Sequence, residues 1–120
     1  MDKCIMIVED DDELQTLYGL YLQGESYEIL RAFNGKQALD ILSKQKPDVI
    51  VLDMIMPEMD GETFLEKFHD INALQNIPII IASVNDKIPQ KYLKLAKVEA
   101  VLKKPFSVEV LLDKIKACVC

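Results

Sequence analysis

Short runs of apolar residues alternate along this chain with segments in which apolar residues recur every three or four positions. The runs are rich in β-branched side chains and predict five strands, at residues 4–8, 27–33, 48–53, 77–83 and 99–103. The other segments predict five helices, whose apolar faces are Leu14, Leu17, Tyr18, Tyr21 and Leu22; Ala38, Leu39 and Leu42; Phe64, Leu65 and Phe68; Ile88, Tyr92, Leu95 and Ala96; and Val108, Leu111, Leu112 and Ile115. Strand is followed by helix five times.

Several helix ends are marked by residues with capping chemistry. Asn34 has the character of an N-cap residue, with Gln37 three positions later, and Ser107 can cap the last helix. Gly24 is typical of a helix end. The acidic run after the first strand suits a helix start, where the helix dipole favours negative charge, and this interpretation covers Asp11, Asp12 and Glu13.

Five strand–helix units in 120 residues predict an α/β fold with one parallel sheet, because each helix returns the chain by a right-handed crossover. This argument leaves open whether the helices cover one face of the sheet or both. In a doubly wound sheet, ligands bind beyond the carboxyl ends of the strands. The residues expected to converge at that edge are Glu9, Asp10, Asp53, Ser83 and Lys104.

The length, composition and charge exclude several classes of protein. A single domain with one core fits 120 residues, of which 50% are apolar and 28% are charged. The apolar runs are too short to span a membrane and the N-terminus lacks the zones of a signal peptide, so we expect a cytoplasmic protein without membrane contact. A net charge of −6 has the wrong sign for direct binding of nucleic acid.

Carboxylates that meet at one edge of a sheet repel one another. At an effective dielectric constant of about 20, two unit charges roughly 4 Å apart cost on the order of 4 kcal/mol, and Lys104 alone cannot offset three of them. A hard divalent cation is required, and oxygen ligands suit Mg²⁺. Beside Mg²⁺, a hydroxyl and an ammonium group, Asp53 has the surroundings of a nucleophile that accepts a phosphoryl group. The predicted chemistry is aspartyl phosphorylation.

Four motifs at these strand ends resemble the receiver domain of two-component response regulators. They are IMIVEDD, VLDMIMPEMDG, IIIAS and VLKKPF, and they are specific in combination and in this order. The resemblance covers residues 3–117, so we expect residues 1–120 to be a single receiver domain. It implies a flavodoxin-like, doubly wound (βα)5 fold with strand order 2-1-3-4-5.

The resemblance also implies how the acidic residues act. Asp53 would accept a phosphoryl group from a phosphohistidine on a histidine kinase or a histidine phosphotransfer protein. Asp10, Asp53 and the backbone carbonyl of Ile55 would bind Mg²⁺ directly, and Glu9 would act mostly through a metal-bound water. The chain would catalyse only its own phosphorylation and dephosphorylation and would not otherwise be an enzyme.

Two further residues would contact the acquired phosphoryl group. By the resemblance, Ser83 would form a hydrogen bond to it and Lys104 an ion pair, and the bond from Lys104 to Pro105 would be cis, as cis peptides are almost confined to proline. The resemblance also allows a phosphorylation-dependent homodimer or an effector protein as a partner.

The chain departs from the family pattern at four positions. Glu9 stands where many relatives have Asp, which keeps the charge on a longer side chain. Val101 stands where the family usually has Tyr or Phe, so the output relay lacks its second member. Lys97 and Val98 replace a small Gly-Ala pair expected before the last strand.

Dephosphorylation depends on how water reaches the acyl phosphate. By family resemblance it is influenced by the positions two past Asp53 and two past Ser83, which are Ile55 and Asn85. Because an apolar Ile55 cannot orient an attacking water, we expect slow self-hydrolysis.

Two other classes of function are alternatives to a phosphoacceptor. The first is a receiver-like docking module whose output does not depend on phosphorylation, which Val101 favours. The second is an enzyme or nucleotide binder of similar fold. A flavodoxin-type phosphate loop is disfavoured by the acids at residues 9–13, which would repel an anion, and a haloacid-dehalogenase-type phosphatase by Ile55, because that class needs a second Asp there.

The remaining candidate residues have simpler structural interpretations. His69 is the only histidine and is not expected to be catalytic or to bind metal. The cysteines are odd in number, which disfavours a disulfide framework, and Cys118 and Cys120 are expected to be inert thiols. Three methionines are expected to pack within a loop, namely Met54, Met56 and Met59.

Overall fold

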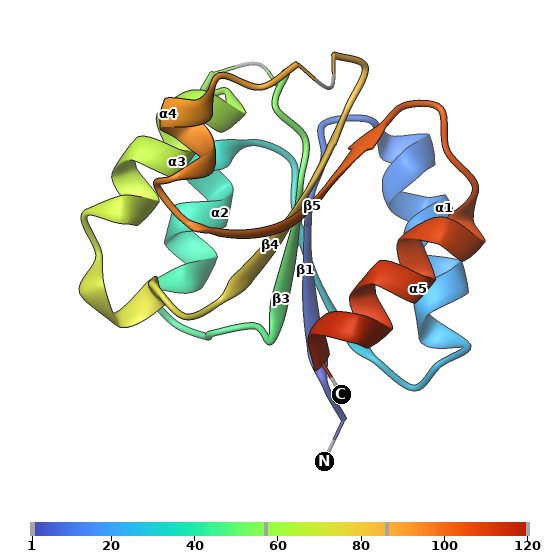
Figure 1. Ribbon diagram of the computed structural model, residues 1–120. Coiled ribbons are helices and arrows are strands. Elements are labelled where there is room, and N and C mark those ends of the chain that lie inside the picture. The colour runs from blue at the N-terminus through green and yellow to red at the C-terminus, as the bar shows by residue number, and fades with distance from the viewer. Residues whose placement is uncertain (1, 57, 86, 120) are drawn as a thin grey trace.

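Five parallel strands form one sheet in the order β2-β1-β3-β4-β5 (Figure 1). The computed structural model describes residues 2–56, 58–85 and 87–119. The strands are β1 (Cys4–Val8), β2 (Glu28–Ala32), β3 (Val49–Leu52), β4 (Pro78–Ser83) and β5 (Lys97–Lys103). The helices are α1 (Asp12–Gln23), α2 (Gly35–Leu42), α3 (Gly61–His69), the 3₁₀-helix η1 (Asn72–Leu74), α4 (Gln90–Leu93) and α5 (Val108–Val119). The predicted α/β class and strand order are confirmed.

Helices cover both faces of the sheet, so the sheet is doubly wound. Helices α1 and α5 lie on one face, and α2, α3 and α4 lie on the other (Figure 1). Because successive strand residues point to opposite faces, Met6 and Ile50 belong to the core beneath α2 and α3, whereas Ile7 and Val51 belong to the core beneath α1 and α5. All residues of β1, β3 and β4 are buried, as expected of central strands in a doubly wound sheet.

The predicted caps of α2 and α5 are confirmed. The Asn34 side chain accepts a hydrogen bond from the Gln37 N–H at 2.8 Å, and the Gln37 side chain accepts one from the Phe33 N–H at 2.9 Å. At α5, the Ser107 hydroxyl accepts a hydrogen bond from the Val110 N–H at 3.3 Å. These side chains satisfy backbone groups that a helix start leaves without partners.

Helix α1 starts and stops where the sequence indicates, but a different face of it meets the sheet. Asp11 is its N-cap and Gly24 its C-cap. Leu17 and Tyr21, predicted on the apolar face, are 41% and 47% exposed. Gln15 is instead almost completely buried. The helix is rotated so that its buried residues are Gln15, Tyr18, Gly19 and Leu22.

The segment between β4 and β5 differs from the prediction. Helix α4 ends at Leu93, and Leu95 and Ala96, predicted on its apolar face, lie in the turn that follows. Strand β5 begins two residues earlier than expected. Lys97 and Val98 therefore lie within the last strand, where they pair with the first two residues of β4. A β-branched residue such as Val98 suits this extended conformation.

Candidate functional site

The register of the neighbouring interior strands β1 and β3 brings Glu9 and Asp53 to the same edge of the sheet. Val8 and Leu52 are partners in the parallel pairing of β1 and β3. The Asp53 N–H donates to the Val8 carbonyl at 3.0 Å, which continues this pairing one residue further. The side chains that follow the strand ends therefore emerge next to each other, as the parallel topology predicts.

Three carboxylates gather at this edge in an arrangement that fits a metal ion. Glu9, Asp10 and Asp53 each offer one oxygen, and these oxygens all lie within 4.8 Å of one another. Glu9 and Asp53 are buried, whereas Asp10 is exposed. A set of carboxylate oxygens open to solvent on one side is the donor chemistry that Mg²⁺ prefers, since this ion retains several waters. The residues fit the expected cation.

Lys104 supplies the positive charge of the site. Its Nζ donates a hydrogen bond to Glu9 Oε1 and lies 3.3 Å from Asp53 Oδ2. Its backbone N–H donates to the Ser83 carbonyl at 2.8 Å, which ties the ends of β4 and β5 together. The peptide bond between Lys104 and Pro105 is cis, as the resemblance implied.

The charges in this cluster shift one another's titration. Burial raises the pKa of Glu9 to about 7 and the charge of Asp53 adds to the rise, although the hydrogen bond from Lys104 opposes it. Burial alone would lower the pKa of the Lys104 ammonium. The hydrogen bond to Glu9 and the charge of Asp53 outweigh this effect, so the pKa of Lys104 is raised. The lysine stays charged, and Glu9 titrates near neutral pH.

Ser83 ends β4 beside the acidic cluster. Its side chain is fully buried, and among the described residues its hydroxyl has no hydrogen-bond partner. It lines a groove together with Ile55, Asn85 and other residues of the loops that follow β3 and β4. A buried hydroxyl without a partner is uncommon in folded proteins, and such a group calls for a specific explanation.

Ile55 is joined to the site through its backbone. Its N–H donates a hydrogen bond to Asp53 Oδ1 at 3.2 Å, and its side chain is 58% exposed. The predicted ligation of a metal by its carbonyl stays a prediction. All the residues predicted from the strand ends thus lie at one edge of the sheet, joined by direct contacts or by a shared groove.

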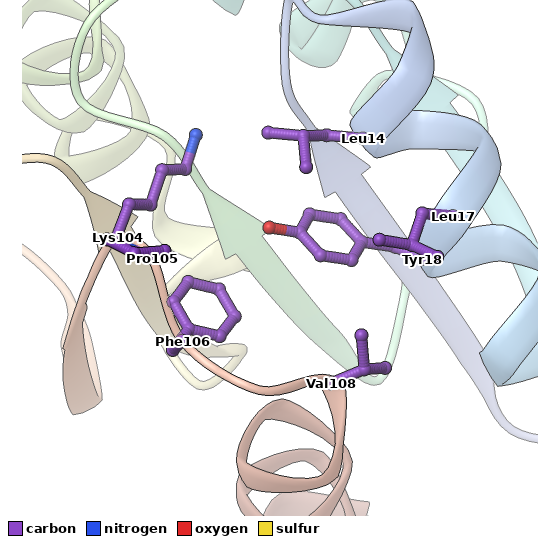
Figure 2. Close-up of a pocket in the computed structure, with 7 residues that line it drawn as sticks. All are labelled: Leu14, Leu17, Tyr18, Lys104, Pro105, Phe106 and Val108. Atoms are coloured by element: carbon purple, nitrogen blue, oxygen red, sulfur yellow. The ribbon is translucent and has the colours of Figure 1, made fainter.

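An apolar pocket adjoins the site on the side of α1. It lies between α1 and the loop that leaves β5, and Figure 2 shows Tyr18 facing this loop and Lys104 at the pocket's edge. The rings of Tyr18 and Phe106 stack with centroids 6.1 Å apart. This packing holds the loop that carries Lys104 against α1.

Sequence reasoning missed Gln15, whose amide donates to the carbonyl of Glu9 at 3.1 Å. The spacing of Gln15 could have indicated its burial. It lies three positions before Tyr18 and seven before Leu22, so it shares a helical face with these two buried residues of α1.

Among the described residues, the methionines, His69 and the cysteines, for which the sequence predicts no catalytic or metal-binding role, lie away from the acidic cluster or within the packed core. Met54 and Met56 are buried, as predicted. The Nδ1 atom of His69 lies 3.1 Å from the Leu95 carbonyl. Cys4 and Cys118 are free thiols, and burial raises the pKa of Cys4 to about 11. Cys120, included in the prediction of inert thiols, lies outside the described residues.

The chain belongs to the response regulator receiver domain family, whose model matches residues 5–116. The polar-differentiation response regulator DivK of Brucella anthropi is 31% identical over 118 residues, which cover 98% of this chain and 96% of that protein. The chemotaxis protein CheY4 of Vibrio cholerae has a TM-score of 0.87 at 27% identity, with 98% of this chain and 99% of that chain covered. The receiver domain of the sensor histidine kinase PA1611 of Pseudomonas aeruginosa, solved with a magnesium ion in its active-site cleft, has the same fold: its TM-score is 0.87 at 23% identity, with 99% of this chain and 98% of that chain covered.

Proposed function

We propose that this chain is a phosphoacceptor in two-component signal transduction and that Asp53 takes a phosphoryl group from a phosphohistidine. The observation that carries the proposal is the convergence of Asp53 with Glu9, Asp10 and Lys104 at one sheet edge. The donor would be a histidine kinase or a histidine phosphotransfer protein. This assignment goes beyond membership of the family, because it gives each side chain a role.

The acidic residues would have two roles, which are binding of Mg²⁺ and nucleophilic attack on phosphorus. Asp10, Asp53 and the Ile55 carbonyl would hold Mg²⁺, and Glu9 would contact it mostly through water. When bound, the ion would neutralise charge on the phosphoryl oxygens. An Asp53 carboxylate oxygen would form the new bond to phosphorus while the phosphorus–nitrogen bond of the donor breaks and its electron pair stays on the imidazole.

Lys104 and Ser83 would stabilise the acquired phosphoryl group. The Lys104 ammonium already contacts Asp53 and would form an ion pair with phosphoryl oxygens. The Ser83 hydroxyl has no partner among the described residues and is therefore free to donate a hydrogen bond to the same group.

The proposal is tested by incubating the protein with acetyl phosphate and measuring its intact mass. In Mg²⁺ we expect the mass of one added phosphoryl group, and in the presence of a chelator we expect none. Equal labelling with and without the metal would contradict the assigned role of the acidic cluster.

Mg²⁺ affinity is expected to rise with pH through the pKa of Glu9. Glu9 is protonated below its pKa of about 7, and a protonated carboxyl is a poor partner for a cation or its waters. One pH unit below this pKa, the affinity should be weaker than its value at high pH by at most about tenfold, because Glu9 contacts the ion mostly through water. Calorimetric titration with MgCl₂ at several pH values measures this. The variant Glu9→Gln should lose the dependence near pH 7, and an unchanged profile in that variant would assign the titration elsewhere.

Slow loss of the phosphoryl group is expected because the exposed side chain of Ile55 offers no hydrogen bond to water. Ile55→Asn, which adds a donor and an acceptor at this position, should speed hydrolysis several-fold by orienting the attacking water. The decay of the phosphorylated mass after removal of acetyl phosphate measures the rate. Ile71→Asn is the control, because Ile71 is also exposed but precedes η1. A half-life of seconds in the wild type would contradict the expectation.

A docking module with phosphorylation-independent output is a second candidate, favoured by Val101. This residue pairs with Ile81 and packs against the core beneath α2 and α3, so no aromatic ring is present there to move. Backbone amide spectra of the phosphorylated and free protein distinguish the two. Shifts that extend along β5 favour a switch, and shifts confined to the acidic site favour the docking module.

The scope of the domain and its partners belong to the same proposal. We propose one receiver domain over residues 1–120 with its core at about 3–117, and the family match at 5–116 supports this. Within the described part of the chain, no helix has the length and apolar character of a membrane span. We propose a cytoplasmic location, no direct contact with nucleic acid or membrane, and a homodimer or effector protein as the partner of the phosphorylated form.

A further inference from the structure

Gln15 is a polar side chain buried between α1 and the ends of two strands. Its exposed fraction is 1%, and its Nε2 lies within hydrogen-bond distance of three backbone carbonyls, which share its two N–H groups: those of Ile7 at 3.0 Å, Glu9 at 3.1 Å and Ala32 at 2.8 Å. Three acceptors require the amide nitrogen at this position, because the amide oxygen would be repelled. The orientation of the side chain is therefore fixed by its surroundings.

Hydrogen bonds from its N–H and to its carbonyl hold the backbone of Glu9 on both sides. The Glu9 N–H donates to the Ala32 carbonyl at 3.0 Å, and the Glu9 carbonyl accepts from Gln15. The Ala32 carbonyl accepts from Gln15 as well, so a single amide joins the end of β1, the end of β2 and the first turn of α1. The carboxylate of Glu9 is then held by the Asp11 N–H and by Lys104.

We propose that Gln15 is a positioning residue for cation binding: its amide holds the backbone from which Glu9 and Asp10 extend. This inference rests on the proposed binding of Mg²⁺ at the acidic cluster. Asp10 is exposed, so its carboxylate depends on the preceding backbone for its placement. Among the described residues, Gln15 donates no hydrogen bond to either carboxylate and acts through the backbone carbonyls of Ile7, Glu9 and Ala32.

A purely structural role would predict a loss of stability without a change in metal affinity, and the chain contains a matched control for it. The two N–H groups of the Gln75 Nε2 are likewise shared among three carbonyls, those of Phe68, His69 and Ile71, at 3.1, 2.8 and 3.3 Å. These carbonyls close the C-terminal end of α3. Because helix and strand run in opposite directions in such a fold, this end lies at the sheet edge opposite to the acidic cluster.

The test compares Gln15→Met with Gln75→Met. Methionine is unbranched and of similar length, so it occupies the space of either side chain, which is buried for Gln15 and half-buried for Gln75, but provides no amide donor. Calorimetric titration with MgCl₂ gives the dissociation constant, and thermal unfolding in a chelator gives the stability. Both variants should unfold at lower temperature. Only Gln15→Met should bind Mg²⁺ more weakly, by about tenfold or more, as is typical when a group that orients a metal ligand is removed.

The outcomes separate this inference from the proposed function. Absence of Mg²⁺ binding by the wild-type protein overturns both. If the wild-type protein binds Mg²⁺, two results overturn the role of Gln15 and leave the proposed function standing. The first is a Mg²⁺ dissociation constant of Gln15→Met within about twofold of the wild-type value. The second is a loss of Mg²⁺ affinity in Gln75→Met equal to that in Gln15→Met.

A measurement on the wild-type protein decides the matter if Gln15→Met does not fold. The side-chain amide protons of Gln15 and Gln75 are observed by NMR during a titration with MgCl₂. Shifts of the Gln15 signals with Gln75 unchanged support the inference, and unchanged Gln15 signals overturn it.

Discussion

Asp53→Asn is expected to gain no phosphoryl group from acetyl phosphate and Mg²⁺, whereas the wild-type protein gains one. The carboxylate oxygen that would form the bond to phosphorus is replaced by an amide, which is a very weak nucleophile. The variant also removes one negative charge from the set of three carboxylates that would hold the cation. We expect the labelled fraction to fall below detection in intact-mass spectra, the largest effect of any substitution considered.

Asp48→Asn is the matched control for this experiment. Asp48 precedes β3 directly and Asp53 follows it, so the two aspartates stand at opposite ends of one strand. Asp48 accepts a hydrogen bond from the Cys4 N–H at 2.7 Å, and its replacement should reduce stability by about 1 kcal/mol without changing the labelling. A phosphoryl gain in Asp53→Asn would move the acceptor to another residue, and loss of labelling in Asp48→Asn would mean that the assay reports folding.

The location of the site was predictable because the topology leaves little freedom. When strands are parallel and alternate with helices, all their carboxyl ends lie at one edge, so a polar residue after each apolar run must lie near the others. Glu9 and Asp53 follow neighbouring strands whose last residues pair directly, Val8 with Leu52. Lys104 is one residue beyond the end of β5 and reaches the same carboxylates.

The rotation of α1 was not predictable from its apolar pattern. The predicted face and the observed face share Tyr18 and Leu22, and they differ in whether Leu17 or Gln15 meets the sheet. Leucine is buried in folded proteins far more often than glutamine, so the sequence alone favours burying Leu17. Gln15 is buried because three carbonyls at the strand ends accept its amide, and such contacts exist only once the strands are in register. Tertiary contacts therefore override the local pattern at the residue that we infer to position the site.

The short helix α4 has a similar explanation. Residues 97 and 98 pair with β4, and this pairing takes the chain into an extended conformation directly after the turn at Leu95 and Ala96. In the sequence the helical periodicity continues through Leu95 and Ala96. The intrinsic helix propensity of these residues adds little stability to so short a helix, so the pairing of the strands determines where the helix ends.

Lys104→Met is expected to slow phosphorylation by about a hundredfold and to destabilise the protein in the absence of metal. The ammonium would no longer stabilise charge on the phosphoryl oxygens, which accounts for the slower labelling by acetyl phosphate at saturating Mg²⁺. The substitution also leaves the buried carboxylates of Glu9 and Asp53 without their cation. Removing one partner of a buried ion pair costs about 3 kcal/mol or more, which chemical denaturation in a chelator would detect.

The pH dependence of this loss has a definite sign. Without the ammonium, burial and the charge of Asp53 raise the pKa of Glu9 above its value of about 7 in the wild type, so the folded state retains a proton that the unfolded chain releases. A group with a raised pKa in the folded state contributes stability at low pH and loses it as pH rises. The stability deficit of Lys104→Met should therefore grow as pH increases through 7, and Mg²⁺ should reduce it by supplying positive charge. Lys103→Met, at the exposed neighbouring lysine, should change stability by less than about 0.5 kcal/mol and leave the labelling rate unchanged. Equal effects of the two lysine variants would show that the ion pair at the sheet edge does not govern phosphoryl transfer.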